Sequence, residues 1–242
     1  MIEPKIRIGT SGYSYSWNKA KPSAFEWYIS QGFNSVEINY SFYRFPPVTS
    51  IKFWQIMAPR DFTFSIKVHR SITHYNRLKQ PRSNELWAQF SKIFEPLESQ
   101  IDFWLFQMPS NFKFKPENME RVRSFFNIDA IMRHVVTLKK AVIEFRDPSW
   151  WNKSALEEIE RAGIAFCSVD APSLPNEILT ISDAIYLRLH GTKTWYNYLY
   201  PEERLKEIVS DMRATRAQKK AIYLNNDHGM LTNGLFLMKS FF

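Results

Sequence analysis

The sequence predicts an α/β fold, a (β/α)8 barrel of the triosephosphate-isomerase (TIM) type with parallel strands, formed by residues 1–242 as a single domain. Eight short apolar segments with β-branched and aromatic residues recur along the chain, and segments with helical signals separate most of them. This alternation favours parallel β/α units. An open doubly wound sheet is the alternative, but it usually has fewer strands and a glycine-rich phosphate loop, whose spacing the segment GTSGYSYSW lacks.

The predicted strands are short, and each ends near polar residues. They cover residues 5–12, 34–40, 62–70, 102–109, 139–146, 164–170, 184–191 and 220–227. Because parallel strands of a barrel end on the same face, these polar residues are expected to meet there.

Helix signals occur between most of these strands. Ser23 and Glu26 form a capping box, and Gly32 stands where that helix should end. Four further helices are predicted. The signals are apolar spacing over residues 83–99, an initial proline over 116–126, a final glycine over 154–163 and oppositely charged ends over 201–214. The segment between residues 170 and 184 carries no clear helix signal, and its prolines favour a loop or a short turn of helix.

The composition limits the class of protein. The single cysteine, Cys167, excludes an internal disulfide, and the first residues, MIEPKIRIGT, lack the apolar core of a signal peptide. No apolar run is long enough to cross a bilayer, so we expect a soluble cytoplasmic protein with no membrane partner. The formal net charge of +8 favours an anionic partner, nucleic acid included.

Side-chain alternation assigns one face of each strand to the barrel axis. In the segment 185–191, Leu187 and Leu189 are expected to face the helices, so Tyr186, Arg188 and His190 face the axis. The same test turns polar residues inward on the other strands, namely Ser11, Glu37, Asn39, Lys67, His69, Gln107, Glu144, Arg146, Ser168, Asp170, Asn225 and Asp227. These residues lie toward the C-terminal strand ends, where barrel enzymes hold their active sites, so the sequence predicts a polar pocket there.

Motifs along the chain also resemble those of one family. The segments GTSGYSYSW, VEINYSFYRFP, FSIKVHR followed by ITH, LFQMPSNF, IEFRDPSW, LRLHGTKTWYNYLY and LNNDHG occur in order and span almost the whole chain. Together they are similar to the YecE-like family, domain of unknown function 72 (DUF72). The resemblance implies a TIM-type barrel but no established reaction, and some members are thought similar in shape to barrel endonucleases that act on damaged DNA.

The predicted pocket favours an enzyme that acts on an anionic substrate, either a phosphorylated metabolite or a nucleotide or nucleic acid. Arg146 and Arg188 would clamp a phosphate or carboxylate, because a planar guanidinium suits paired oxygens. Glu37 or Glu144 would act as general acid or base, and His190 would carry a proton.

Further residues are assigned to the same pocket. Lys67 would stabilise developing negative charge or, once desolvated, attack a carbonyl as a Schiff-base amine. Asp170 and Asp227 complete the catalytic candidates. With the two arginines, the residues expected to bind substrate are Ser11, Tyr13, Asn39, Tyr43, His74, Gln107, Tyr196, Asn225 and Asn226.

Other functions stay open at this point. A nucleic-acid-binding protein without turnover would use the aromatic and basic loops to stack bases. A metal-dependent hydrolase would draw ligands from Glu37, Glu144, Asp170, His190 and Asp227, but HxH and HExxH spacings are absent and we assign no metal site. In a third interpretation the ring has a structural role only, and its charged side chains neutralise one another in ion pairs. The sequence identifies no cofactor, reaction or oligomeric state.

Overall fold

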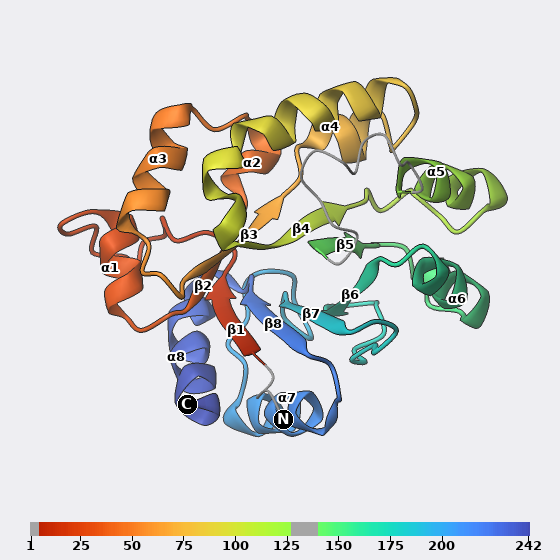
Figure 1. Cartoon of the computed structure of the whole chain (residues 1–242). Coiled ribbons are helices and arrows are strands. Elements are labelled where there is room, and N and C mark those ends of the chain that lie inside the picture. Colours follow the sequence, from red (N-terminus) through yellow and green to blue (C-terminus); the bar gives the residue numbers. More distant parts are fainter. Residues whose placement is uncertain (1–4, 127–139) are drawn as a thin grey trace.

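A computed structural model describes residues 5–126 and 140–242, which form a barrel of eight parallel strands with helices on its outside (Figure 1). The strands are β1 (Lys5–Thr10), β2 (Ser35–Ile38), β3 (Thr63–Lys67), β4 (Ile101–Gln107), β5 (Ala141–Glu144), β6 (Ala165–Asp170), β7 (Ala184–Leu189) and β8 (Lys219–Leu224). They pair in the order β1-β8-β7-β6-β5-β4-β3-β2. The predicted TIM-type barrel is therefore confirmed.

Helices follow most of the strands. The α-helices are α1 (Ala24–Ser30), α2 (Tyr40–Tyr43), α3 (Val48–Met57), α4 (Arg82–Ile93), α5 (Pro116–Phe126), α6 (Lys153–Arg161), α7 (Glu202–Ala214) and α8 (Met230–Phe241). Shorter helical turns are η1 (Ser71–Tyr75), η2 (Glu95–Gln100), η4 (Pro148–Trp150) and η5 (Asp227–Gly229). Within the described ranges, no helix combines the length and the apolar character needed to span a membrane.

Local signals explain most of the helix boundaries. Ser23 caps α1 by accepting a hydrogen bond from the Glu26 amide at 3.2 Å, as the capping box predicts. The helix predicted over residues 83–99 is divided, because Pro96 has no amide hydrogen to continue α4 and the chain passes into η2. The predicted loop between β6 and β7 contains no helix over residues 171–183.

The sequence signals do not predict α3 and α8. In α8 the reason is clear, because Asn233 and Gly234 both have low helix propensity. A Cβ atom at Gly234 would lie 2.6 Å from the ring of Phe33, so only glycine fits there. The Asn233 carboxamide accepts from the Tyr200 amide and donates to the Tyr200 carbonyl, both at 3.0 Å. Packing against the barrel, and not helix propensity, selects these two residues.

Apolar side chains form one layer between strands and helices and another inside the barrel. In the outer layer, Trp104 of β4 packs edge to face against Trp87 of α4. In the inner layer, Phe103 meets Tyr186 edge to face, and Tyr186 packs against Tyr223. These inner residues precede the polar residues of the same strands, so they fill the barrel on its N-terminal side and leave the polar groups at the other end.

The orientation of β6 is the exception to the predicted alternation. We expected Ser168 and Asp170 to face the axis, but Cys167 and Val169 belong to the inner apolar layer instead. Ser168 accepts a hydrogen bond from the Leu179 amide at 2.9 Å, on the outer side of the strand. No helix follows β6, so the loop over residues 171–183 covers its outer face, and the Ser168 side chain points toward that loop.

The barrel closes between β1 and β2 with little direct pairing of the two backbones. A single bridge joins Ser11 to Glu37. Elsewhere the Tyr28 hydroxyl accepts from the Thr10 amide at 2.9 Å and donates to the Ser35 carbonyl at 2.8 Å. Two side chains therefore supply bonds that a ladder would make, since the Asn34 carboxamide also accepts from the Ile8 amide at 2.8 Å and donates to the Ile6 carbonyl at 3.0 Å.

Replacing Tyr28 with phenylalanine should weaken this closure. The Y28F change removes both bridging hydrogen bonds and leaves a buried amide and carbonyl without their partner, at a cost of about 1–3 kcal/mol in the free energy of unfolding. Urea denaturation measures this loss. Tyr75→Phe, an exposed phenol on η1, is the matched control and should unfold like the wild type. Equal stability of Y28F and the wild type would show that Tyr28 does not close the barrel.

Candidate functional site

Arg188 lies at the centre of a buried ionic cluster at the C-terminal ends of the strands. Its Nη1 donates to Glu144 Oε2 at 2.7 Å, and its Nη2 donates to Glu37 Oε1 at 2.7 Å and to Ser11 Oγ at 3.2 Å. All three charged side chains are inaccessible to solvent, so their attraction is weakly screened. Burial favours the neutral guanidine, but the two glutamates outweigh it and hold the pKa of Arg188 well above its usual value.

Glu37 is surrounded by donors. In addition to Arg188, its carboxylate accepts from Ser11 Oγ at 2.7 Å, from Asn39 Nδ2 at 3.1 Å and from the Tyr186 hydroxyl at 2.6 Å. Burial and the neighbouring carboxylate raise the pKa of Tyr186 well above its usual value, so the phenol keeps the proton that it donates. These four donors match the lone-pair capacity of one carboxylate.

Glu144 joins the cluster to the mouth of the barrel. Its Oε2 accepts from Arg188, and its Oε1 forms an ion pair with Arg146 Nε. Burial alone would raise the pKa of Glu144, but Arg146 and Arg188 outweigh burial and hold the pKa well below its usual value. The carboxylate is therefore ionised across the physiological pH range.

His190 is a neutral hydrogen-bond acceptor in this cluster. Its Nε2 lies 3.2 Å from Nη2 of Arg146 and 3.5 Å from Nη1 of Arg188. Nε2 also lies 3.5 Å from Oε1 of Glu144, which can only accept, and Nδ1 lies 3.1 Å from Nδ2 of Asn225, which can only donate. Burial, and then the two arginines, lower the pKa of His190 well below its usual value.

Lys67 ends β3 and differs from the other charged groups of the cluster. The residue is 8 % exposed, yet among the described residues no side chain or carbonyl forms a hydrogen bond or ion pair with its amine. Nζ lies 4.3 Å from the centre of the Phe42 ring. Burial, the largest cause, and the charge of Arg188 lower the pKa of Lys67 to about 7.

The mouth above the cluster carries further cationic and aromatic side chains. The Arg146 guanidinium lies 4.6 Å from the centre of the Trp195 ring. Burial, followed by the charges of Lys67 and Arg146, lowers the pKa of His74 to about 4, so this imidazole is neutral near pH 7. Tyr43 is an exposed residue on the rim.

A hollow of about 420 Å³ adjoins the cluster beside the loop that follows β1. Ser11, Tyr13 and Asn39, three of the predicted substrate-binding residues, line it together with Tyr15 and Trp54. The Tyr13 hydroxyl accepts from Trp54 Nε1 at 2.8 Å. This hollow therefore connects predicted binding residues to the ionic cluster through Ser11.

Three predicted site residues lie outside the cluster. Asp170 faces the outside of the barrel, where its carboxylate accepts from Arg204 Nη2 at 2.8 Å. Asn226 donates to Asn233 Oδ1 of α8 at 2.9 Å and is also directed away from the axis. Asp227 begins η5 with a φ of 45°, and its carboxylate forms no hydrogen bond or ion pair with the described residues.

The other predicted residues lie around the mouth or outside it. Gln107 ends β4 at the same face, and Tyr196 lies by His190 with ring centres 5.6 Å apart. His69, which we expected to face the axis, instead packs edge to face against Phe45, with ring centres 4.8 Å apart, on the side of the outer layer.

The sequence placed Phe42 and Trp195 only on the rim of the mouth, as aromatics that could stack bases, and gave Tyr186 no role; the structure brings all three into contact with the cluster. Tyr186 lies two residues before Arg188 on β7, so both side chains face the barrel axis. The alternation that identified Arg188 therefore also places Tyr186 on the axis. Phe42 and Trp195 lie in loop and helix segments whose path the sequence does not define.

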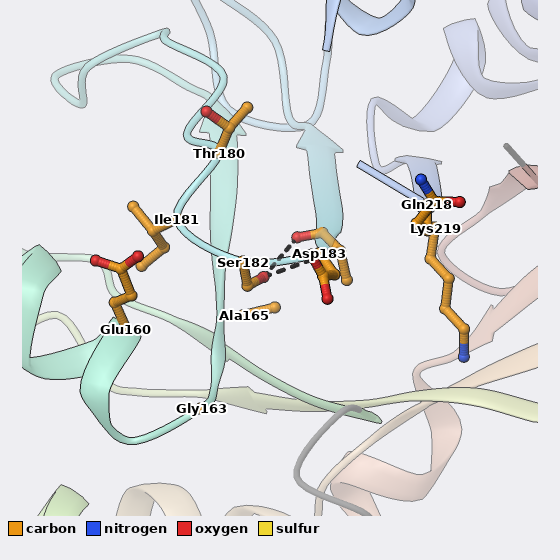
Figure 2. A pocket seen from close by; sticks show the side chains of 10 residues that line it. Glu160, Gly163, Ala165, Thr180, Ile181, Ser182, Asp183, Gln218 and Lys219 are labelled. Atoms are coloured by element: carbon orange, nitrogen blue, oxygen red, sulfur yellow. Dashed lines mark hydrogen bonds between the residues drawn. The ribbon is translucent and has the colours of Figure 1, made fainter. Parts of the chain in front are cut away.

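A larger hollow, about 730 Å³ among the described residues, lies at the opposite end of the barrel (Figure 2). Glu160, Ser182, Asp183 and Lys219 are among its lining residues, at the N-terminal ends of β6, β7 and β8. Figure 2 shows the Ser182 side chain turned into a hydrogen bond with the neighbouring backbone. This hollow contains none of the predicted site residues, so the chemistry of the site belongs to the smaller one.

The charged side chains of the described residues are arranged as ion pairs and not as a set of metal ligands. Over residues 5–126 and 140–242, His, Cys, Asp and Glu side chains form no group of three that could hold a metal ion. The carboxylates of Glu37 and Glu144 instead face guanidinium groups, and Asp170 is turned away from them.

The fold and the cluster define a TIM-type barrel protein with a buried ionic site at the C-terminal ends of its strands. The chain belongs to the family described as "Protein of unknown function DUF72", which matches residues 7–234. The YecE-like resemblance seen in the motifs is therefore confirmed.

Known proteins with similar sequences or folds agree with this assignment. The chain is 24 % identical over 260 residues to the UPF0759 protein YunF of Bacillus subtilis, covering 93 % of this chain and 89 % of that protein. A DUF72 family protein from Thermotoga maritima has a TM-score of 0.81 at 27 % identity, covering 97 % and 98 % of the two chains.

Two further solved structures share the fold alone. A DUF72 family protein from Enterococcus faecalis has a TM-score of 0.82 at 18 % identity, covering 98 % of this chain and 95 % of that one. The structure described as SacUVDE has a TM-score of 0.59 at 12 % identity, covering 97 % of both chains.

Removing the central guanidinium should destabilise the fold in a pH-dependent manner. Arg188→Met leaves two buried carboxylates without their shared cation, at a cost of about 3–5 kcal/mol near neutral pH. Glu144 loses one of the two arginines that hold its pKa down, so this pKa rises, the folded state takes up a proton on acidification, and the gap to the wild type narrows as pH falls. Urea denaturation at about pH 8 and about pH 5 measures this change.

Arg123→Met is the matched control for this experiment. Arg123 forms an ion pair with Glu158 on the surface, where solvent screens the charges, so its loss should change stability little. The central role of Arg188 is wrong if both variants lose the same small amount of stability.

Proposed function

We propose that this protein is an enzyme that binds an anionic substrate at the mouth of the barrel and uses the amine of Lys67 in the reaction. The observation that carries the proposal is the state of that amine, which is buried without a bonded partner among the described residues. Burying a cation without a partner costs stability, and such costs are concentrated at functional sites.

A second buried lysine supports this interpretation by contrast. Lys220 of β8 is 5 % exposed, and its Nζ donates to the Met212 carbonyl at 2.7 Å and to the Thr215 carbonyl at 3.0 Å. These carbonyls lie at the C-terminal end of α7, where a cation also suits the helix dipole. Lys220 thus has the partners of a structural lysine, which Lys67 lacks.

The balance of charge supports an anionic ligand. Glu37 and Glu144 offset Arg188 and Arg146 within the cluster, which leaves the ammonium form of Lys67 as a surplus positive charge. An anionic group between Lys67, His74 and Arg146 would offset it and would accept hydrogen bonds from all three side chains. Arg188 is not needed for this contact, because its donors are directed at the glutamates.

Proton transfer is the chemistry that Lys67 suits best. With a pKa of about 7, the group populates both protonation states near neutral pH and so serves as acid or base. The charged groups that act on it are Arg188, Glu144, Glu37 and Arg146, in that order. A bound anion would add a negative charge beside Lys67 and raise its pKa, which shifts the balance toward the ammonium form without removing the neutral amine.

A nucleic-acid ligand without turnover is the second candidate, supported by the rim of the mouth. The Arg70 guanidinium lies 5.9 Å from the centre of the Tyr43 ring and 5.5 Å from that of Tyr75. Arg44 lies 4.8 Å from the centre of the Tyr40 ring. Exposed aromatic rings beside arginines are the groups that stack bases and contact the backbone of single strands.

Sulfate binding should depend on pH through Lys67. Sulfate keeps its charge in this range, and His74 with a pKa of about 4 stays neutral, so the titrating group is Lys67. Sulfate affinity should be greatest below about pH 7. Above that pH it should fall, by at most about tenfold per pH unit, because only the ammonium form of Lys67 attracts the anion. Isothermal titration calorimetry measures the profile, and Lys67→Met should make it weak and flat.

The stability of the variants shows whether Lys67 has a structural role. The folded-state pKa of about 7 lies below the ordinary value of 10.5, so Lys67 destabilises the fold below that value, and most strongly at pH 7 and lower. Lys67→Met should therefore be more stable than the wild type. Burial also lowers the pKa of Lys220, but Lys220→Met leaves the Met212 and Thr215 carbonyls without their donor, so it should be less stable and should bind sulfate normally. A pH-independent sulfate affinity in the wild type would contradict the proposal.

Salt dependence distinguishes the second candidate. If the rim binds single-stranded nucleic acid, affinity for an oligonucleotide should fall steeply with salt, and Arg70→Gln should reduce the slope by about one. Fluorescence anisotropy at two salt concentrations measures this slope. Arg161→Gln, a charge on the outer helix α6, serves as the control. Absence of salt-dependent binding excludes this candidate.

A further inference from the structure

We propose that Lys67 forms a Schiff base with the carbonyl group of its substrate, which makes the substrate an anionic aldehyde or ketone. The inference rests on the proposed function, because it assigns covalent chemistry to the same site. It adds a bond-forming role to a residue that the proposed function uses only as a proton carrier and a positive charge.

The position of Lys67 suits a nucleophile. An amine attacks through its lone pair, so it must be free of a hydrogen-bond donor and must reach the substrate. Nζ faces the Phe42 ring at 4.3 Å, and within the described part of the chain it forms no hydrogen bond. The aromatic face restricts the amine without engaging its lone pair. Lys220, by contrast, directs its amine at two backbone carbonyls.

The protonation state favours the same chemistry. Near pH 7 about half of the Lys67 side chains carry a neutral amine, because burial and Arg188 lower its pKa to about 7. An ordinary surface lysine is neutral in only about one molecule in 10³ at that pH. The selectivity for Lys67 over other lysines therefore follows from its environment.

The reaction balances with groups that are present. The lone pair of Nζ forms a bond to the carbonyl carbon while the π electrons of the carbonyl move to oxygen. Both protons of the neutral amine pass to that oxygen, the carbon–oxygen bond breaks, and water leaves. The resulting imine takes up one proton, and the negative charges of Glu144 and Glu37 favour the iminium while burial, Arg188 and Arg146 oppose it.

The anionic part of the substrate has its own place. Arg146, partly exposed beneath Trp195, and His74 lie beside Lys67 at the mouth, so a carboxylate or phosphate held there would bring a nearby carbonyl to the amine. A carboxylate and a phosphate offer the same oxygens to these donors. Both ligand classes are therefore arms of the test.

Reductive trapping tests the inference on the full chain. The protein is incubated near pH 7 with cyanoborohydride and either pyruvate or glyceraldehyde 3-phosphate, and peptide mass spectrometry follows each lysine. Hydride addition to the iminium carbon gives a stable secondary amine, heavier by the carbonyl compound less one oxygen atom. The peptide that contains Lys67 should be labelled at least ~10-fold faster than any other lysine peptide.

Controls separate this inference from the proposed function. Acetone, which has a carbonyl but no charge, should label Lys67 slowly, and sulfate should slow labelling by both anionic compounds. Lys220→Met should keep the fast labelling and Lys67→Met should lose it. Sulfate binding with Lys67 labelled no faster than other lysines would overturn the Schiff base and leave the proposed function standing. The loss of both sulfate binding and labelling would overturn both.

Discussion

The site depends on one guanidinium held between two carboxylates inside the barrel. Arg188 on β7 reaches Glu144 on β5 and Glu37 on β2, so one side chain ties together strands on different sides of the axis. Removing three charges from water is costly, and the ion pairs offset this cost through close geometry and further donors around Glu37, although Nε of Arg188 has no hydrogen-bond partner among the described residues. Ser11 and Tyr186 are two of the donors to Glu37.

Because Glu37 and Glu144 both pair with Arg188, the net charge of the mouth depends on the other ionisable side chains. A count of inward charges along the sequence includes Asp170 and Asp227 and gives a net negative ring. The structure turns Asp170 to an outer pair with Arg204 and leaves Asp227 in η5, so the ring becomes positive whenever Lys67 is protonated. The sign of the site therefore depends on the orientation of a few carboxylates, and a positive ring is consistent with the anionic ligand proposed above.

The sequence predicted the barrel and most of the cluster because aliphatic and polar residues alternate in a common phase. This rule failed at β6, where small apolar residues such as Cys167 fill the interior and Asp170 faces a loop and Arg204. The rule assumes a helix outside every strand, and none follows β6. Lys67 was correctly placed on the axis, but its lack of a bonded partner depends on where Glu144 and Arg188 meet in space, which no local pattern encodes.

The closure between β1 and β2 has a consequence for the motions of the barrel. A phenol and a carboxamide hold this line together, so a rotation of Tyr28 or Asn34 releases backbone groups that elsewhere are held by a continuous ladder. Local opening of the barrel should therefore cost the least free energy between β1 and β2. This seam ends at Ser11, beside the hollow of about 420 Å³. Opening along this line would widen that entrance and give ligands a route of exchange with the solvent.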